Sequence, residues 1–296
     1  MTPKKVSRGA VLESLYQHRL LSSTQLHAMH WQEESERSTR RVLTALNHAG
    51  LVSMVRATDG GGSVYFLTPK GAEAVEQVSK PAPKRKAIKR EYAEGPLRAH
   101  TLAVNEAAIA FMKAARERGD EFEPPAWHHE IYHSIGPTRQ DVVRADALLT
   151  YLQHAQGADG RSSVLHYRLL ELDRATEPTD KLAAKLASYA RLYRYTRPNQ
   201  RRPAWQARYD TFPGVICVVA GKKSAAALER RVEAVLSLCD SDPELRRTPQ
   251  VEISFCLLGD LVERGPFAPI WQRPDSPHSY DWLGTPASSA DGEAAI

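Results

Sequence analysis

Cysteine is scarce in this sequence. The 296 residues contain three cysteines, Cys217, Cys239 and Cys256, with no CxxC spacing, so we expect reduced thiols and no disulfide framework. No run approaches the roughly 18 consecutive apolar residues that a membrane span needs. The first residues, MTPKKVSRGAVLESL, include lysines but lack the apolar core of a signal peptide. These absences argue against secreted and membrane proteins, and we expect a cytoplasmic protein with no membrane partner.

The composition is otherwise that of a globular protein. Charged residues make up 25% of the chain and hydrophobic residues 42%. The length suffices for two modest domains, each with a core of ordinary size. The formal net charge of +5 is mildly basic, which favours a polyanionic partner.

Residues 1–79 form the first predicted domain. Segments 6–20, 22–29 and 35–50 have the pattern of helices, and two β-rich segments, LVSMVRA and SVYFLTP, flank the turn TDGGG. The segment KGAEAVEQV adds a short closing helix. Three helices followed by a two-stranded hairpin predict a winged helix-turn-helix, whose third helix normally enters the major groove of DNA.

The third predicted helix has an apolar face and a basic face. Its apolar side carries Val42, Leu43, Leu46 and Ala49. The opposite side and its flank carry groups suited to phosphates or to guanine edges, namely Arg37, Arg40, Arg41, Thr44 and His48. Arg56 lies beside the hairpin tip, where a contact with the DNA backbone is expected. Double-stranded DNA is therefore the predicted partner; the alternative is a winged module for protein contacts, with solvated basic residues.

A basic, proline-containing segment follows at 80–95. It begins KPAPKRKAIKRE and has no acidic residue before Glu91. One interpretation is a solvated linker; the other is a basic arm that contacts DNA phosphates through Lys84, Arg85 and Lys86. At the far end, residues 284–296 have the composition of a disordered tail.

Residues 96–283 alternate between helical and strand patterns. The order from residue 97 is helix, three strands, helix, strand, helix and strand, with a loop predicted at 154–163. The strand LHYRLLELD places Glu171 and Asp173 on one face, because side chains alternate along a strand. The strand VVRADALLTY is its expected hairpin partner and would bring Asp146 near Glu171. Three converging acids repel one another unless a cation lies among them, and oxygen ligands suit Mg²⁺ or Mn²⁺.

These motifs carry a resemblance to known families. An αβββαβ unit with Asp146 and Glu171 on consecutive strands resembles the PD-(D/E)xK nuclease fold over about residues 97–220. Together with the winged helix, the stretches HTLAVNEAAIAF, RADALL and LELDRATEPTDKLAAKLASY resemble the replication-relaxation family of plasmid and mobile-element proteins, which is related to MobC-type relaxases. The resemblance implies an α+β chain in which a winged helix-turn-helix precedes a restriction-endonuclease-like mixed sheet.

The resemblance also implies roles for individual residues. Asp146 and Glu171 would be the metal ligands. Asp173 stands where the nuclease pattern has its lysine, and an aspartate cannot position or activate the attacking water as that lysine does. The missing charge would have to come from Lys185 or Lys181 in the following helix, or from Arg174 beside the acids. The implied catalytic set is Asp146, Glu171, Asp173 and Lys185.

Three interpretations of the acids stay open. They form an ion-pair network with Arg174, Glu177 and Lys185, or a hydrolytic metal site, or a nuclease-derived surface that binds DNA without chemistry. The leading functional hypothesis is a DNA-binding protein of a plasmid or mobile element, acting in replication, mobilisation or transcription control. The alternatives are an active metal-dependent endonuclease or relaxase, and an oligomerising regulator, such as a homodimer, whose second domain senses a ligand or partner.

Overall fold

The computed structural model describes residues 7–31, 34–56, 62–79, 87–157 and 160–286. The residues that lie close together in space divide the chain into two compact units. Unit 1 is 1–112 with 123–129, and unit 2 is 113–122 with 130–296. In this grouping the helix that begins at Leu97 belongs to unit 1 through Met112. The predicted boundaries at 79, 95 and 283 stay a prediction.

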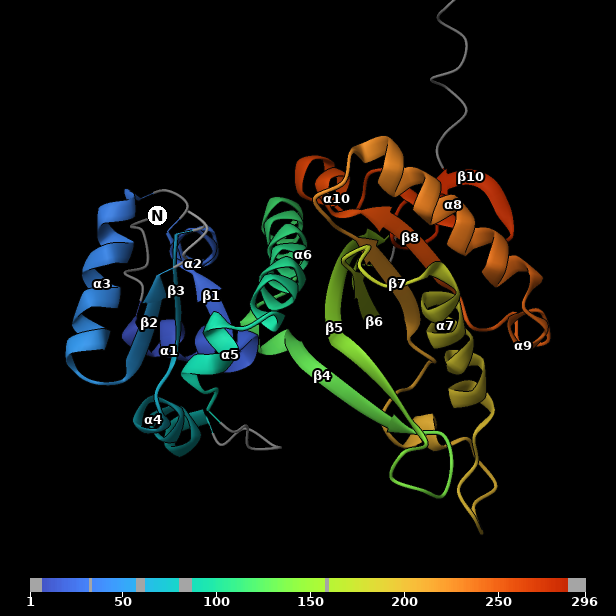
Figure 1. The fold of residues 1–296 in the computed structure, drawn as a ribbon, viewed down its shortest axis with the longest axis horizontal. Coiled ribbons are helices and arrows are strands. Elements are labelled where there is room, and N and C mark those ends of the chain that lie inside the picture. Colours follow the sequence, from blue (N-terminus) through green and yellow to red (C-terminus); the bar gives the residue numbers. More distant parts are fainter. Residues whose placement is uncertain (1–6, 32–33, 57–61, 80–86, 158–159, 287–296) are drawn as a thin grey trace, which may run out of the picture. The chain divides into compact units, whose positions relative to one another are not determined.

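Unit 1 contains short helices and a small sheet (Figure 1). Its elements are α1 (Arg8–His18), β1 (Leu20–Ser22), α2 (Ser23–His30), α3 (Glu36–His48), β2 (Val52–Arg56), β3 (Ser63–Leu67), α4 (Pro69–Ser79) and α5 (Arg90–Glu94). The three strands are antiparallel in the order β1-β3-β2. The predicted three helices, hairpin and closing helix are confirmed, whereas β1 was not predicted and α5 lies inside the predicted linker.

Local signals in the sequence account for the boundaries of these helices. The Ser22 hydroxyl accepts a hydrogen bond from the Gln25 backbone, and the Gln25 side chain accepts one from the Ser22 backbone, which forms a capping box. Gly50, with a φ of 69°, follows α3 in the left-handed conformation that favours glycine.

Unit 2 is built on a mixed sheet with strand order β10-β9-β8-β7-β6-β5-β4. From α6 onward the elements are α6 (Leu97–Arg118), η1 (Pro124–Ala126), β4 (Trp127–Ser134), β5 (Val142–Gly157), β6 (Gly160–Asp173), α7 (Thr179–Arg194), η2 (Ala204–Ala207), β7 (Gly214–Val219), α8 (Ala225–Ser241), α9 (Pro243–Arg246), β8 (Ile253–Leu257), α10 (Leu258–Arg264), β9 (Trp271–Arg273) and β10 (Ser276–Tyr280). Strands β6, β7 and β8 are parallel, and β5 pairs antiparallel with β6. The predicted α+β class is confirmed, and so is the predicted order of the longer elements α6, β4, β5, β6, α7, β7, α8 and β8; the short helices η1, η2 and α9 were not predicted.

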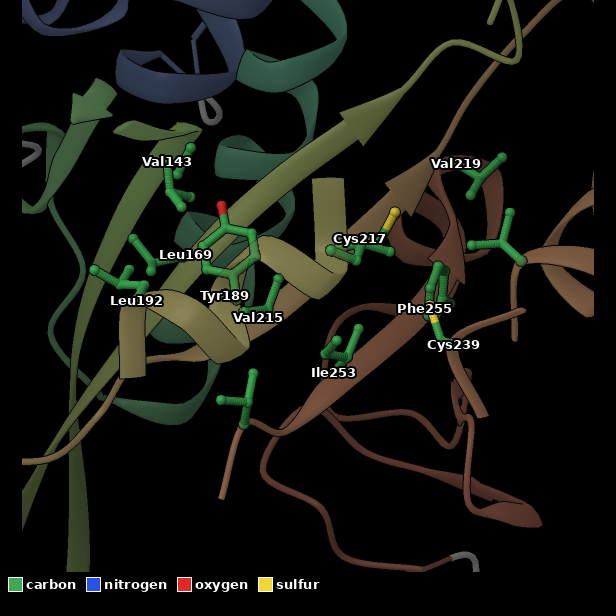
Figure 2. Packing of buried hydrophobic residues seen from close by; sticks show 14 of the residues in the cluster. Val143, Leu169, Tyr189, Leu192, Val215, Cys217, Val219, Cys239, Ile253 and Phe255 are labelled. Atoms are coloured by element: carbon green, nitrogen blue, oxygen red, sulfur yellow. The ribbon is translucent and has the colours of Figure 1, made fainter. Parts of the chain in front are cut away.

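The main core of unit 2 lies between one sheet face and the helices α7 and α8. Figure 2 shows Tyr189 and Leu192 of α7 beside Leu169 and Val215 of the sheet. All four side chains are at most 1% exposed. This packing orients α7 so that one of its sides lies over the strand that carries Glu171.

One sequence prediction in unit 2 is wrong. Residues 154–157 and 160–163 of the predicted loop are strand instead, since β5 and β6 stay paired out to Gly157 and Gly160. His154 contributes a side-chain hydrogen bond across this ladder to Ser163. The last predicted strand corresponds to β8, which ends at Leu257, and α10 begins at the next residue. Within the described ranges, no helix combines the length and apolar character required to cross a membrane.

Candidate functional site

The β5–β6 hairpin brings Asp146 next to the end of β6. Ala147 pairs with Leu170, and the carboxylate of Asp146 accepts a hydrogen bond of 2.8 Å from the backbone N–H of Leu172. The predicted pairing of these two strands is confirmed. Asp146 therefore lies close enough to Glu171 for its charge to act on that carboxyl group.

Glu171 is the most deeply buried acid of the cluster, with a side chain 1% exposed. Its two oxygens accept hydrogen bonds from two residues of α7: the ammonium of Lys185 and the hydroxyl of Tyr189. Lys185 and Tyr189 are four residues apart and so lie on the same side of the helix. The structure thus brings Asp146, Glu171 and Lys185 together, while the catalytic roles of these residues stay predictions.

Burial and neighbouring charges act against each other in the titration of this cluster. Desolvation raises the pKa of Glu171 to about 8, against the two donors Lys185 and Tyr189, which favour the charged form. Burial acts to lower the pKa of Lys185, but the neighbouring Glu171 and Asp146 outweigh it, so the net shift is upward and the ammonium stays charged. Burial and the same carboxyl group hold the pKa of Tyr189 well above its usual range, so its hydroxyl remains a donor.

Asp173 has a different partner. Arg231 of α8 donates to both of its carboxylate oxygens, and the two side chains are 10% and 7% exposed. The backbone N–H of Ala175 adds a hydrogen bond of 2.9 Å. Arg231 also donates to the backbone carbonyl of Glu177 at 2.7 Å. Part of the ion-pair hypothesis is therefore right, but the cation that pairs with Asp173 is Arg231, which the sequence analysis missed.

The acids as they are arranged do not fit a bound divalent cation. Both oxygens of Glu171 are engaged by α7, and both oxygens of Asp173 are engaged by Arg231. Across the residues that the structure describes, no three His, Cys, Asp or Glu side chains are grouped so that they could hold a metal ion. Binding of Mg²⁺ or Mn²⁺ by Asp146 and Glu171 would require the Lys185 ammonium to leave, and such a site stays a prediction.

The predicted DNA-reading face of α3 is exposed. Thr39, Leu43 and Leu46 form its buried side. The exposed side carries the predicted residues Arg37, Arg40, Arg41, Thr44 and His48. Thr39 was not expected in the core; it is held there by a 2.9 Å hydrogen bond with His27 of α2.

Of the remaining predicted DNA contacts, the structure describes one and leaves three undescribed. Arg56 is exposed at the end of β2, where it pairs with Ser63 across the hairpin. Lys84, Arg85 and Lys86 lie outside the described residues.

Arg40 of α3 forms an ion pair of 3.2 Å with Glu36, one turn earlier on the same helix, so the charge of Arg40 is partly neutralised within α3.

Unit 1 contains a buried polar cluster around Asn105, in which His129 takes part. Asn105 is fully buried, and its side-chain oxygen accepts hydrogen bonds of 3.0 and 2.8 Å from His18 and His129. Its amide nitrogen donates to the carbonyls of His18 and Leu20. These contacts satisfy buried polar groups and join the end of α1 to α6 and β4, so Asn105 and His129 have a structural role here.

Comparison with protein families gives one finding. A family model described as Replication-relaxation matches residues 12–207, about two-thirds of the chain. The matched region runs from α1 to the end of η2 and includes the α3 face and the Glu171 cluster. No curated protein matches the chain.

Proposed function

We propose that this chain, which belongs to the replication-relaxation family, is a plasmid replication-related protein that binds duplex DNA through unit 1. Its second unit, in this proposal, is a nuclease-derived scaffold that does not cut DNA. The observation that carries the proposal is the exposed basic face of α3, which lies opposite the side that packs into unit 1.

The arrangement of unit 1 supports a winged helix-turn-helix. Helices α1, α2 and α3 precede the β2–β3 hairpin, and β1 completes the small sheet beside β3. In such domains the third helix enters the major groove and the hairpin contacts the backbone. α3 offers Arg37 and Arg41 for this purpose, since among the described residues neither has an ion-pair partner. A guanidinium group there can donate in a bidentate manner to a guanine edge or to a phosphate.

Binding of duplex DNA with single variants of unit 1 tests this proposal. Arg41→Ala should weaken binding in a fluorescence-anisotropy titration by roughly 5- to 150-fold, which corresponds to the ~1–3 kcal/mol typical of one arginine contact to a base. Arg8→Ala is the matched control, because Arg8 is also exposed but lies at the start of α1. Equal affinities for Arg41→Ala and the unmodified protein would remove α3 as the reading helix.

The contacts of the acid cluster support a scaffold without cleavage. Hydrolysis by a nuclease of this fold needs carboxylates that hold a metal and a lysine that acts on the attacking water. Here Lys185 donates to Glu171 itself, and Asp173, at the position of the nuclease lysine, is paired with Arg231. Lys185 of α7 and Arg231 of α8 therefore pair with carboxylates that a nuclease would keep available for a metal ion.

A nicking assay separates this proposal from its rival, an active metal-dependent endonuclease or relaxase. Supercoiled plasmid is incubated with the protein and either Mg²⁺ or Mn²⁺, and the nicked form is quantified by gel electrophoresis. We expect no nicking above the level of the Asp146→Ala variant. Metal-dependent nicking that Asp146→Ala and Lys185→Ala both abolish would establish the rival function.

A further inference from the structure

We propose that unit 2 has its own binding surface for the phosphate backbone of duplex DNA, formed by an arginine-rich turn between α7 and η2. We refer to residues 195–203 as the basic turn. This inference rests on the proposed function, which supplies duplex DNA as the partner. It places a second contact with the DNA on unit 2, and that contact does not depend on α3.

The charge of this part of the chain is of one sign. No aspartate or glutamate occurs between Asp180 and Asp210. The same interval contains eight basic residues, namely Lys181, Lys185, Arg191, Arg194, Arg197, Arg201, Arg202 and Arg208. The whole chain has 40 basic and 35 acidic residues, so a stretch of this length with bases alone is a local feature and not a consequence of the net charge.

Hydrogen bonds fix the shape of the basic turn. Thr196 and Pro203 form an antiparallel bridge, and the N–H of Ala204 donates to the carbonyl of Tyr195 at 2.8 Å. Within the turn, the N–H of Gln200 donates to the carbonyl of Arg197 at 3.0 Å. Asn199 adopts a φ of 63°, a conformation that asparagine tolerates better than most residues. In Figure 1 the chain beyond α7 runs out as a narrow loop before it returns to β7.

Aromatic packing anchors the base of the turn. The indole N–H of Trp205 donates to the carbonyl of Tyr193 at 3.0 Å, and the two rings stack. Phe212 packs edge-on against both rings. The Tyr195 hydroxyl donates to the carbonyl of Gly136 at 3.1 Å. The turn is thus held on the core of unit 2, so little ordering entropy would be lost when it binds a ligand.

The arginines at the tip have no side-chain partner among the residues that the structure describes. Arg197, Arg201 and Arg202 are exposed, and in the described part of the chain none of them forms a side-chain hydrogen bond or an ion pair. Arg194, by contrast, is bound by Glu244 and Thr248. An unpaired guanidinium keeps five N–H donors for an external acceptor and matches phosphate geometry well.

Neighbouring segments extend the same charge. Arg139 is exposed on the 135–141 segment that the Tyr195 hydroxyl contacts, and Arg208 donates to the carbonyl of Tyr132 on β4. Four acids lie in these neighbouring segments or beside the turn. Glu130 on β4 is paired with Arg144, and Glu244 of α9 is paired with Arg194. The other two are Asp210 and Asp141, and the charge of Arg191 helps to lower the pKa of Asp141. Positive charge therefore predominates over several side chains around the turn.

A polyanion with closely spaced phosphates suits this surface best. The exposed side chains of the basic turn are polar or are prolines, so the turn has no large apolar side chain to insert into a membrane. Duplex DNA presents phosphates at short intervals along both strands, and each one neutralised by an arginine releases counterions.

Salt-dependent DNA binding tests the inference. The triple variant Arg197→Ala/Arg201→Ala/Arg202→Ala removes three charges, so the slope of log K against log[salt] should become shallower by about 2–3. Between 50 and 200 mM NaCl, the loss of affinity should then be roughly 40-fold smaller than for the unmodified protein if all three phosphate contacts are lost. The corresponding triple Arg→Lys variant keeps the charge and should keep most of the slope.

A matched control removes the same charge elsewhere in unit 2. Lys222→Ala/Lys223→Ala/Arg230→Ala changes exposed residues that follow the end of β7, whereas the basic turn precedes its start. The six residues of β7 separate the two regions by roughly 20 Å. This control should leave the slope nearly unchanged, and all three variants should keep the thermal unfolding midpoint because the substituted side chains are exposed.

The outcomes are distinguishable. The inference is overturned if the basic-turn variant keeps the original slope, if the control lowers the slope equally, or if the variant loses binding to phosphatidylserine vesicles but not to DNA. If Arg37→Ala/Arg41→Ala has no effect while the basic-turn variant weakens DNA binding, the role of α3 fails and the basic turn stands. The opposite pattern overturns the basic turn alone.

Discussion

Replacing Arg231 with methionine should lower the free energy of unfolding by about 3–5 kcal/mol, the usual cost of leaving one member of a buried ion pair without its partner. Arg231 and Asp173 are suited to this test because their side chains are only 10% and 7% exposed. Methionine keeps most of the aliphatic packing of the arginine stem, so the loss reports mainly on the guanidinium group.

The magnitude follows from the contacts that disappear. Arg231 makes two hydrogen bonds to the Asp173 carboxylate, one of them 3.1 Å long, and one of 2.7 Å to the carbonyl of Glu177. A hydrogen bond to a charged group contributes about 1.5–3 kcal/mol net, and a neutral one about 0.5–1.5 kcal/mol. Asp173 would keep the N–H of Ala175 but would have no cation to offset its burial.

Urea unfolding followed by tryptophan fluorescence measures this loss, since Trp205, Trp271 and Trp282 lie in unit 2. The matched control is Arg230→Met, which changes the exposed neighbour on the same helix and should alter stability by less than about 0.5 kcal/mol.

The double variant Asp173→Asn/Arg231→Met should lose clearly less than the sum of the two single losses, because it removes both charges. A loss below about 1 kcal/mol for Arg231→Met, or strictly additive single losses, would refute the view that this ion pair neutralises the acid and joins α8 to β6.

Three further outcomes can be checked by the same unfolding measurements. Tyr189→Phe removes a hydroxyl that donates to buried Glu171 and should cost about 1–3 kcal/mol, with Tyr193→Phe as the control on the same helix. Burial lowers the pKa of His133 to about 4, so the unfolded chain binds a proton that the folded chain excludes; stability should fall as the pH drops from about 6.5 to 4, by at most about 1.4 kcal/mol per pH unit. His133→Gln should flatten that fall, and an unchanged pH profile would contradict the assignment. Asn105→Ala removes the hydrogen bonds that the amide makes to buried imidazole and carbonyl groups in unit 1 and should cost roughly 2–4 kcal/mol; a loss under 1 kcal/mol would mean that water replaces the amide.

Elements with a strong periodic pattern could be predicted from the sequence. α3 and α7 bury one face each, and the fully apolar β7 is buried along its whole length. Capping residues gave the start of α2, where Ser22 accepts from the Gln25 backbone. α7 begins directly after Pro178 without a side-chain cap, and the fixed backbone angle of proline sets the start of the helix instead.

The candidate site was predictable only where its residues are close in sequence or on paired strands. Side-chain alternation and the hairpin gave the proximity of Asp146 and Glu171, and α7, which follows directly, supplied Lys185. Arg231 lies 58 residues beyond Asp173. In the sequence it looks the same as Arg230, the neighbouring arginine of the same helix. Which of these two reaches the acid depends on how α8 packs on the sheet, and tertiary packing of this kind leaves no local signal in the sequence.

The buried thiols of unit 2 provide a built-in reporter of its opening. Cys217, Cys239 and Cys256 are at most 2% exposed, and burial raises the pKa of each thiol. Because the thiolate is the reactive form, a thiol-specific reagent can modify these residues only after the core that surrounds them separates. No cysteine occurs before residue 217, so the labelling rate follows unit 2 without interference from unit 1. A comparison of labelling with and without DNA would therefore test whether unit 2 becomes more rigid when DNA is added.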